Sequence, residues 1–572
     1  MRTLLVHPAD DPVCGARAGE AWDRILDLGT AGWSSYRKWS EMFACQVEEI
    51  EKLDDADFDE IRDALSAGLG VLVDKHGLDW WDLIAFEFHQ QFEQVVQLKK
   101  LAASLGRRDE VFVTRSGFHT DVLELLLDRP VRSLSSDNST LRKLRRYARV
   151  FSKFSAQQLL EILGDKYDTG YQLRRLLAHR PKTSSRPVVL LPSAYINVTR
   201  TELQYAEMLP DSDFFLVTTR QSGWVADAPK NVTVTKLASF AHGASSRSEF
   251  ASLLERWNQL KRDLMHSQIL SVLIRSGALD SFPKFLRDGL LIRDAWLQVF
   301  RQQPVQAVLC ADDANLPTRV PLLIATQRGL PAISCHHGAL DGRHRFRPRQ
   351  NCLFLAKGKM EQDYLTRVCQ VAAENIEIGA PRRKQNSHAS QPAQKRSIVF
   401  FSEPYEVLGG RCAQFYNEIL PPLAEVAAAT GHELVLKLHP LETFHDRVRL
   451  ANASLSAAQR KLTRVVTRHL TDELLAQTWC AVTIVSTTAV DCALRGIPVF
   501  LCEWLDYSHY GYGQQFTKFG VGTALTSPDE IRSLPAIMQR FTANNTGDLW
   551  APVSPAGLSA FLTAHVPMAA AV

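Results

Sequence analysis

A run of three hydroxyl side chains, Ser486-Thr487-Thr488, directly follows the apolar segment VTIV (482–485). Hydroxyls and free backbone amides at the start of a helix bind anions, and the helix dipole contributes roughly 0.3–2 kcal/mol per charge. Parallel α/β sheets bind their ligands just beyond the carboxyl ends of the strands. The run is therefore a candidate phosphate site, although Ser and Thr also cap helices without any ligand.

A histidine, His439, ends a second apolar segment, ELVLKLHP (433–440), and is followed by Pro440. An imidazole with an ordinary pKa of about 6.5 donates a hydrogen bond to a phosphate or carries a positive charge beside it. A single histidine is more often structural, but we expect His439 at the same sheet edge as Ser486. That shared position favours one anion site built from both segments.

Residues suited to acid–base chemistry follow other strand-like segments. His336-His337-Gly338 ends the run PAISC, and Gly338 lets a ligand approach the backbone closely. Adjacent side chains of a strand point to opposite faces, so we expect only His337 to face a ligand. The other candidates for a general base are Asp10, Asp11, Asp312 and His119. Capping of the following helix is the alternative role for the acidic residues.

One acidic pattern is rejected as a site. Asp55-Ala56-Asp57 matches the D-x-D pattern of metal-dependent sugar transferases, but no strand precedes it. It lies in KLDDADFDEIRDAL, where acidic residues lead into a helical apolar pattern, and such residues are favoured in a first helical turn.

The ten cysteines form no C-x-x-C pair, which argues against a disulfide framework and a zinc site. We expect no metal site.

The elements that must position these residues occur twice. Segments 305–338 and 481–502 each contain an apolar run, a polar turn, a helical stretch, Arg-Gly-[Leu/Ile]-Pro and another apolar run. Gly suits the left-handed position after a helix, Pro stops the helix, and Arg complements its dipole. Strand, helix and strand in this order predict a βαβ unit and a parallel sheet covered by helices.

We therefore predict an α/β fold with two Rossmann-like domains that face a cleft, at 1–345 and 346–572. Helical patterns at 51–106 and 247–302 indicate that helices enlarge the N-terminal domain. The basic, irregular segment RHRFRPRQ (343–350) is the expected hinge. A chain of 572 residues is too long for a single core, which agrees with this division.

Composition narrows the function. A net charge of +4 gives no basis for nucleic-acid binding, and no apolar stretch approaches the roughly 18 residues of a membrane span. The apolar run Leu4–Val6 is too short for a secretory signal, so we expect a cytoplasmic protein. Basic clusters such as Arg142–Arg146 are interpreted as solvated, with contact to acidic carbohydrate or to anionic lipid headgroups of the inner membrane as the alternatives.

Several of these motifs together resemble a known family. His337-Gly338, Lys437-Leu438-His439-Pro440 and Ser486-Thr487-Thr488, continuing to Arg495-Gly496-Ile497-Pro498, are similar to GT-B glycosyltransferases of bacterial surface-polysaccharide synthesis. The similar groups are the capsule-synthesis enzymes, the CDP-glycerol glycerophosphotransferases and the polysialyltransferase-like enzymes. The resemblance implies that the His-Pro histidine and the Ser/Thr pair hold the donor's phosphate. It assigns the donor's ribose to Asp491, where Glu is more usual, while Asp10-Asp11-Pro12 departs from the acidic motif of the polysialyltransferase-like group.

The resemblance implies a metal-independent glycosyltransferase of capsule polysaccharide biosynthesis that needs no cofactor. It would move a sugar or related group from a nucleotide-activated donor, with cytidine favoured as the base, to a carbohydrate or lipid-linked acceptor. Two alternatives stay open at this point. One is an isomerase that resembles the nucleotide-sugar 2-epimerases, and the other is a non-catalytic GT-B relative that binds polysaccharide.

Overall fold

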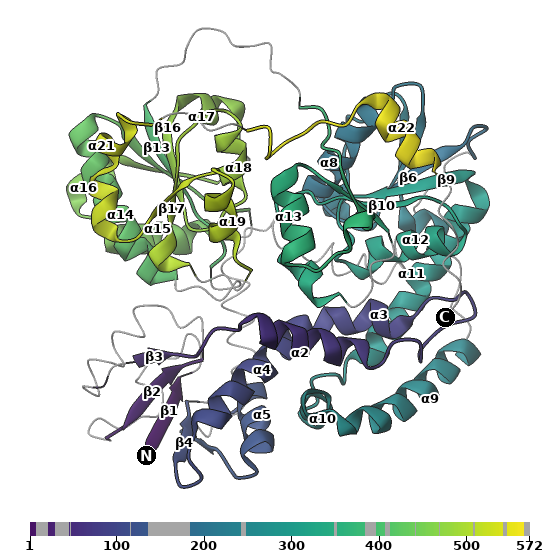
Figure 1. The fold of residues 1–572 in the computed structure, drawn as a ribbon, viewed down its shortest axis with the longest axis horizontal. Helices are drawn as coiled ribbons and strands as arrows, with labels where there is room; N and C mark the ends of the chain where they lie inside the picture. The colour runs from purple at the N-terminus through teal and green to yellow at the C-terminus, as the bar shows by residue number, and fades with distance from the viewer. Residues whose placement is uncertain are drawn as a thin grey trace. The chain divides into compact units, whose positions relative to one another are not determined.

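The computed structural model describes residues 1–6, 21–28, 45, 47–114, 116–134, 183–241, 247–347, 352–383, 396–405, 412–440, 442–467, 470–506, 510–541 and 546–564. The strands within these ranges form three parallel sheets of five, seven and six strands (Figure 1). The predicted α/β class is confirmed. The sequence indicated two Rossmann-like sheets, and the five-stranded sheet near the N-terminus is additional.

The six-stranded sheet has the order β15-β14-β13-β16-β17-β18. Its strands are β13 (Ser397–Phe401), β14 (Glu433–Lys437), β15 (Thr463–Val466), β16 (Thr478–Thr483), β17 (Val499–Cys502) and β18 (Thr523–Leu525). Its helices are α14 (Cys412–Thr430), α15 (Phe444–Ser454), α16 (Ala457–Lys461), α17 (Asp472–Gln477), α18 (Thr488–Ala493), α19 (Tyr512–Lys518), α20 (Pro528–Arg532) and α21 (Leu534–Met538). The strand order reverses between β13 and β16, and ligands bind at such a reversal in doubly wound sheets.

The seven-stranded sheet has the order β12-β11-β10-β9-β6-β7-β8. Its strands are β6 (Val188–Ser193), β7 (Asp213–Thr218), β8 (Val232–Lys236), β9 (Val305–Cys310), β10 (Ala332–Ser334), β11 (Leu353–Ala356) and β12 (Ile376–Ile378). The helices between these strands are α8 (Ile196–Glu207), α9 (Arg247–Asp263), α10 (Gln268–Arg275), α11 (Phe282–Gln302), α12 (Leu316–Gln327) and α13 (Lys359–Arg367). Here the order reverses between β6 and β9.

The chain leaves the seven-stranded sheet after residue 378 and not near 345, because β11 and β12 extend the sheet beyond β10. It also returns to it: α22 (Pro555–Thr563), yellow in Figure 1, buries Leu558 and Leu562 in the same core as Val189. Two compact units result. Unit 1 comprises Met1–Leu53, Gln97–Phe154 and Gln385–Leu549, and unit 2 comprises Asp54–Val96, Ser155–Lys384 and Trp550–Val572.

The five-stranded sheet has the order β3-β2-β1-β4-β5. Its strands are β1 (Arg2–Val6), β2 (Arg24–Asp27), β3 (Val47–Glu49), β4 (Glu110–Val113) and β5 (Arg132–Ser133), and α4 (His89–Ser104) and α5 (Phe118–Leu127) border β4 in the chain. Its small core contains Leu4, Ile25 and Phe112. The described helices include none that is long and apolar enough to cross a membrane.

The structure contains the repeats and the helix start that were predicted from local sequence patterns. Both predicted βαβ repeats form, and Gly329 and Gly496 adopt φ values of 68° and 67°, the left-handed conformation expected after each helix. The rejected D-x-D pattern is a helix start: α2 (Asp55–Ser66) begins with a capping box in which Asp54 and Asp57 accept each other's backbone N–H. Unit 2 also contains the short helix α3 (Trp80–Ile84).

Candidate functional site

Three polar residues follow the three central strands of the six-stranded sheet. Ser402 comes after β13, His439 after β14 and Ser486 after β16. Neighbouring strands lie about 4.8 Å apart, so these residues are spread over roughly 10 Å of one sheet edge. The strand order reverses between β13 and β16, so the three residues surround the position where a doubly wound sheet binds its ligand.

The hydroxyl run does not serve as an ordinary helix cap. Helix α18 begins at Thr488, and Thr487 at its N-cap makes no side-chain capping hydrogen bond. The Ser486 hydroxyl lies 2.9 Å from that of Thr488, and its backbone N–H donates to the Thr483 hydroxyl at 3.3 Å. The helix has only six residues, so its dipole contributes little, and the hydroxyls are its main polar groups. Asp491 lies in its first turn.

A buried carboxylate, Glu442, fixes the backbone that carries His439. Its Oε2 accepts the His439 backbone N–H at 2.6 Å, and its Oε1 accepts the Ser402 hydroxyl at 2.7 Å. Arg447 forms an ion pair with the same carboxylate at 2.6 Å. Glu442 therefore joins the ends of β13 and β14. It was not predicted from the sequence, although its position three residues after His439, in the same turn, was a usable signal. Pro440 is exposed in that turn.

The electrostatics of this edge favour an anion. Burial, followed by the nearby Lys437 ammonium, lowers the pKa of His439 to about 4. Lys437 is 6% exposed, burial lowers its pKa, and its Nζ donates to the Leu438 carbonyl at 2.6 Å. A phosphate placed here would offset the cost of burying the ammonium and favour the protonated imidazole. Ser486 and Thr488 add hydroxyl groups along the same edge.

Because its folded-state pKa is lowered, His439 is expected to make stability depend on pH. Unfolded histidine binds a proton near pH 6.5, whereas folded His439 does so near pH 4. The neutral ring of His439 therefore costs the folded state nothing well above pH 6.5. As the pH falls from 6.5 toward 4, protonation of the unfolded state lowers the free energy of unfolding, and the loss is about 2 kcal/mol at pH 5. Melting temperatures from pH 7.5 to 5 should fall less steeply in His439→Gln. Equal slopes in both proteins would contradict this expectation.

A second polar cluster lies within unit 2, at the edge of the seven-stranded sheet. Tyr195 follows β6, Asp312 follows β9 and His337 follows β10. The Tyr195 hydroxyl donates to Asp312 Oδ2 at 2.7 Å and lies 3.4 and 3.5 Å from the two ring nitrogens of His337. Two predicted residues, Asp312 and His337, are thus brought together. Tyr195 joins them and was not predicted.

The members of this cluster differ in what they can do chemically. Asp312 is fully buried and accepts hydrogen bonds from the Ala314 N–H at 3.0 Å, from Asn315 and from Tyr195. A bound molecule cannot reach the Asp312 carboxylate, which therefore acts by orienting Tyr195. His337 is only partly buried, and burial lowers its pKa, which favours the neutral ring. Burial and Asp312 raise the pKa of Tyr195, which keeps it a donor.

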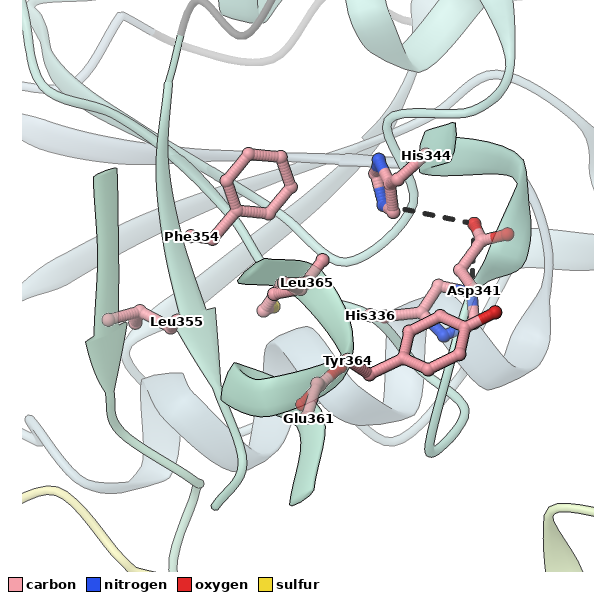
Figure 2. Close-up of a pocket in the computed structure, with 9 residues that line it drawn as sticks. His336, Asp341, His344, Phe354, Leu355, Glu361, Tyr364 and Leu365 are labelled. Carbon is pink, nitrogen blue, oxygen red and sulfur yellow. Dashed lines mark ion pairs between the residues drawn. The ribbon is translucent and has the colours of Figure 1, made fainter. Parts of the chain in front are cut away.

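The expectation that His336 and His337 point to opposite faces is wrong. Strand β10 ends at Ser334, so neither residue has strand geometry, and the two rings lie 4.3 Å apart. His336 lines a small pocket with His344, Asp341 and Glu361 (Figure 2). Its Nε2 lies 3.4 Å from Asp341 Oδ2, while burial and His337 lower its pKa well below the usual value.

The basic segment predicted as a hinge is a packed part of unit 2 up to residue 347. Residues Gly342–Phe346 form a 3-10 turn, and the charged side chains from it and the next residue pair with carboxylates. These pairs are Arg343 with Asp341 at 2.9 Å, Arg345 with Asp55 at 2.6 Å, and Arg347 with Asp313. His344 lies 3.7 Å from Asp313, and burial lowers the pKa of its ring. The positive charges of this segment up to Arg347 therefore have carboxylate partners within unit 2. Residues 348–350 lie outside the described ranges.

The other predicted base candidates are His119, Asp10 and Asp11. His119 lies on α5, beside the five-stranded sheet of unit 1. Asp10 and Asp11 lie outside the described residues. Within the described part of the chain, no group of three or more His, Cys, Asp or Glu residues has an arrangement that could hold a metal ion.

No protein-family model and no curated protein sequence matches this chain. Among solved structures, a putative UDP-N-acetylglucosamine 2-epimerase from Listeria monocytogenes is similar at 11% identity and a TM-score of 0.37, covering 66% of this chain and 94% of that one. The wall teichoic acid polymerase TagF is similar at 12% identity and 0.36, covering 73% and 92%. The UDP-GlcNAc 2-epimerase from Methanocaldococcus jannaschii is similar at 10% identity and 0.40, covering 63% and 96%.

Proposed function

We propose that this protein is a glycosyltransferase that moves a sugar or related group from a nucleotide-activated donor to a carbohydrate or lipid-linked acceptor of surface-polysaccharide synthesis. The proposal is carried by one observation: His439, Ser402 and Ser486 follow three adjacent strands at the reversal point of the six-stranded sheet. This arrangement suits a nucleotide phosphate. Asp491, in the first turn of α18, is assigned to the donor's ribose.

In the proposed reaction the bond between the donor's sugar and its phosphate breaks, and negative charge develops on the leaving phosphate. Lys437, the His439 imidazole and the hydroxyls of Ser486 and Thr488 stabilise that charge from fixed positions. We assign these groups the role that a metal ion has in other transferases, so transfer is expected to persist in excess EDTA. A cytidine nucleotide is the favoured donor.

The acceptor hydroxyl is proposed to lose its proton to His337. The neutral ring of His337 accepts the proton, and Tyr195, held by Asp312, fixes the ring's position. The acceptor oxygen then bonds to the sugar's anomeric carbon, and the nucleotide leaves with the electron pair of the broken bond. Asp312 is buried behind Tyr195 and takes no proton in this scheme.

The proposed donor site is tested by nucleotide-induced stabilisation. We expect one of CMP, CDP, UDP, GDP and ADP to raise the melting temperature of the wild type and not that of His439→Ala. At 100 times its dissociation constant a ligand contributes about 2.7 kcal/mol, which a thermal-shift measurement detects. His432→Ala is the matched control, because His432 directly precedes β14 at the opposite end of the strand. Failure of all five nucleotides to stabilise the wild type would refute the proposal.

Product analysis then separates transfer from isomerisation. Incubation with the identified donor alone should leave the donor's sugar unchanged, because a transferase needs an acceptor. Conversion of the sugar nucleotide to its epimer without any acceptor would instead establish an isomerase.

A further inference from the structure

One large aromatic side chain of unit 2, Trp224, is exposed in the loop that follows β7. Trp224 is 39% exposed, whereas most tryptophans of a folded protein are largely buried. Four other tryptophans of the same unit have at most 1% of their surface exposed: Trp80, Trp81, Trp257 and Trp296. Burying an exposed ring of this size against a ligand would remove apolar surface from water, so Trp224 is available for a stabilising contact.

The loop that carries Trp224 is fixed to the backbone of Tyr195. A Cβ atom at Gly223 would lie 3.3 Å from the Ala194 carbonyl carbon and from the Tyr195 nitrogen, so only glycine fits without a shift. The Thr199 hydroxyl donates to the Gly223 carbonyl at 2.7 Å, and the Ser222 hydroxyl donates to the Ala194 carbonyl at 3.2 Å. Trp224 is therefore held one residue beyond a tight contact with Tyr195.

The surroundings of the ring are polar and charged. The Lys236 ammonium lies 5.2 Å from the centre of the Trp224 ring, in cation–π contact. A single aromatic face with a charged rim is too small for a protein interface, which buries roughly 800 Å² per partner. It suits a pyranose ring, which has an apolar C–H face and a rim of hydroxyls.

We propose that Trp224 forms an acceptor subsite, in which its indole stacks against one sugar ring of a saccharide at the sheet edge that also carries Tyr195 and His337. The inference rests on the proposed transferase function and adds the chemical class that unit 2 recognises. Lys236 provides a donor for the ring's hydroxyl or acidic substituents.

The test measures saccharide binding without transfer. A panel of immobilised neutral and acidic oligosaccharides is incubated with wild type, Trp224→Ala, Trp224→Phe and Met265→Ala. Met265 is an exposed apolar residue of the same unit, at 40%, and serves as the matched control. We expect the best wild-type ligand to bind roughly tenfold more weakly to Trp224→Ala, while Trp224→Phe and Met265→Ala stay close to wild type. A preference for acidic over neutral oligosaccharides would identify the acceptor as anionic.

Three results would overturn the subsite. They are the absence of oligosaccharide binding by wild type, equal binding by Trp224→Ala, and loss of nucleotide-induced stabilisation in Trp224→Ala, which would identify the ring as a nucleobase contact. Failure of the transferase proposal is distinguishable, because it appears as absent nucleotide stabilisation in the wild type while saccharide binding still depends on Trp224.

Discussion

Replacing Arg293 by alanine is expected to lower the free energy of unfolding by about 3–5 kcal/mol. Arg293 is 1% exposed and pairs with Asp74 at 2.6 Å, Glu249 at 2.7 Å and Asp294 at 2.7 Å. Removing it would leave the fully buried side chain of Asp74 with an uncompensated charge. Although burial raises the pKa of Glu249, its hydrogen bonds to Arg293 and Lys75 lower that pKa to about 2, so a second carboxylate also loses one of its two partners.

The measurement is the midpoint of urea unfolding, compared with an exposed ion pair of the same unit. Arg186 is 63% exposed and lies 3.5 Å from Asp213, so Arg186→Ala should cost about 0–1 kcal/mol. Arg293→Lys keeps the charge but loses the fork that contacts several carboxylates, and an intermediate midpoint is expected. If Arg293→Ala shifts the midpoint no more than Arg186→Ala does, the buried network has no special role in stability.

The predictable part of the fold is the part encoded by neighbouring residues. The two βαβ repeats could be predicted because the apolar run of the strand and the Arg-Gly-[Leu/Ile]-Pro signal that ends the helix lie close together in the sequence. Both repeats form. The five-stranded sheet could not, because β2 and β3 have only four and three residues. A period of two cannot be recognised in strands that short, and their pairing with β1 and with each other is decided by the tertiary structure.

Tertiary proximity also explains what was missed at the candidate sites. Tyr195 contacts His337 across 142 positions of sequence, and nothing near either residue predicts the other. The basic segment at 343–350 looked like a hinge because a sequence shows its positive charges but not the carboxylates that pair with them, which are the buried Asp341 and Asp313 and the exposed Asp55. By contrast, His439 and Ser486 could be proposed together, since two strand ends of one parallel sheet share an edge.

The other large expected effect concerns the proposed base. His337→Ala should lower the rate of transfer by a factor of about 10² to 10⁴ and leave nucleotide-induced stabilisation unchanged. The alanine removes the neutral ring that takes the acceptor's proton, whereas the proposed phosphate site is formed by other residues, on the six-stranded sheet. Release of nucleotide from the identified donor in the presence of acceptor provides the assay. Tyr195→Phe should show a smaller loss, because the ring then loses only its positioning partner.

The pH profile shows whether His337 acts as the base or only supports the fold. The base must be neutral, and burial lowers the pKa of His337, so the wild-type rate should hold as the pH falls to about 6.5 and decline only below it. The residual activity of His337→Ala should lack that acidic decline. His266→Ala, an exposed histidine of the same unit, should keep both the rate and the profile. An unchanged acidic decline in His337→Ala would move the assignment of the base to another residue, because the titrating group would then still be present.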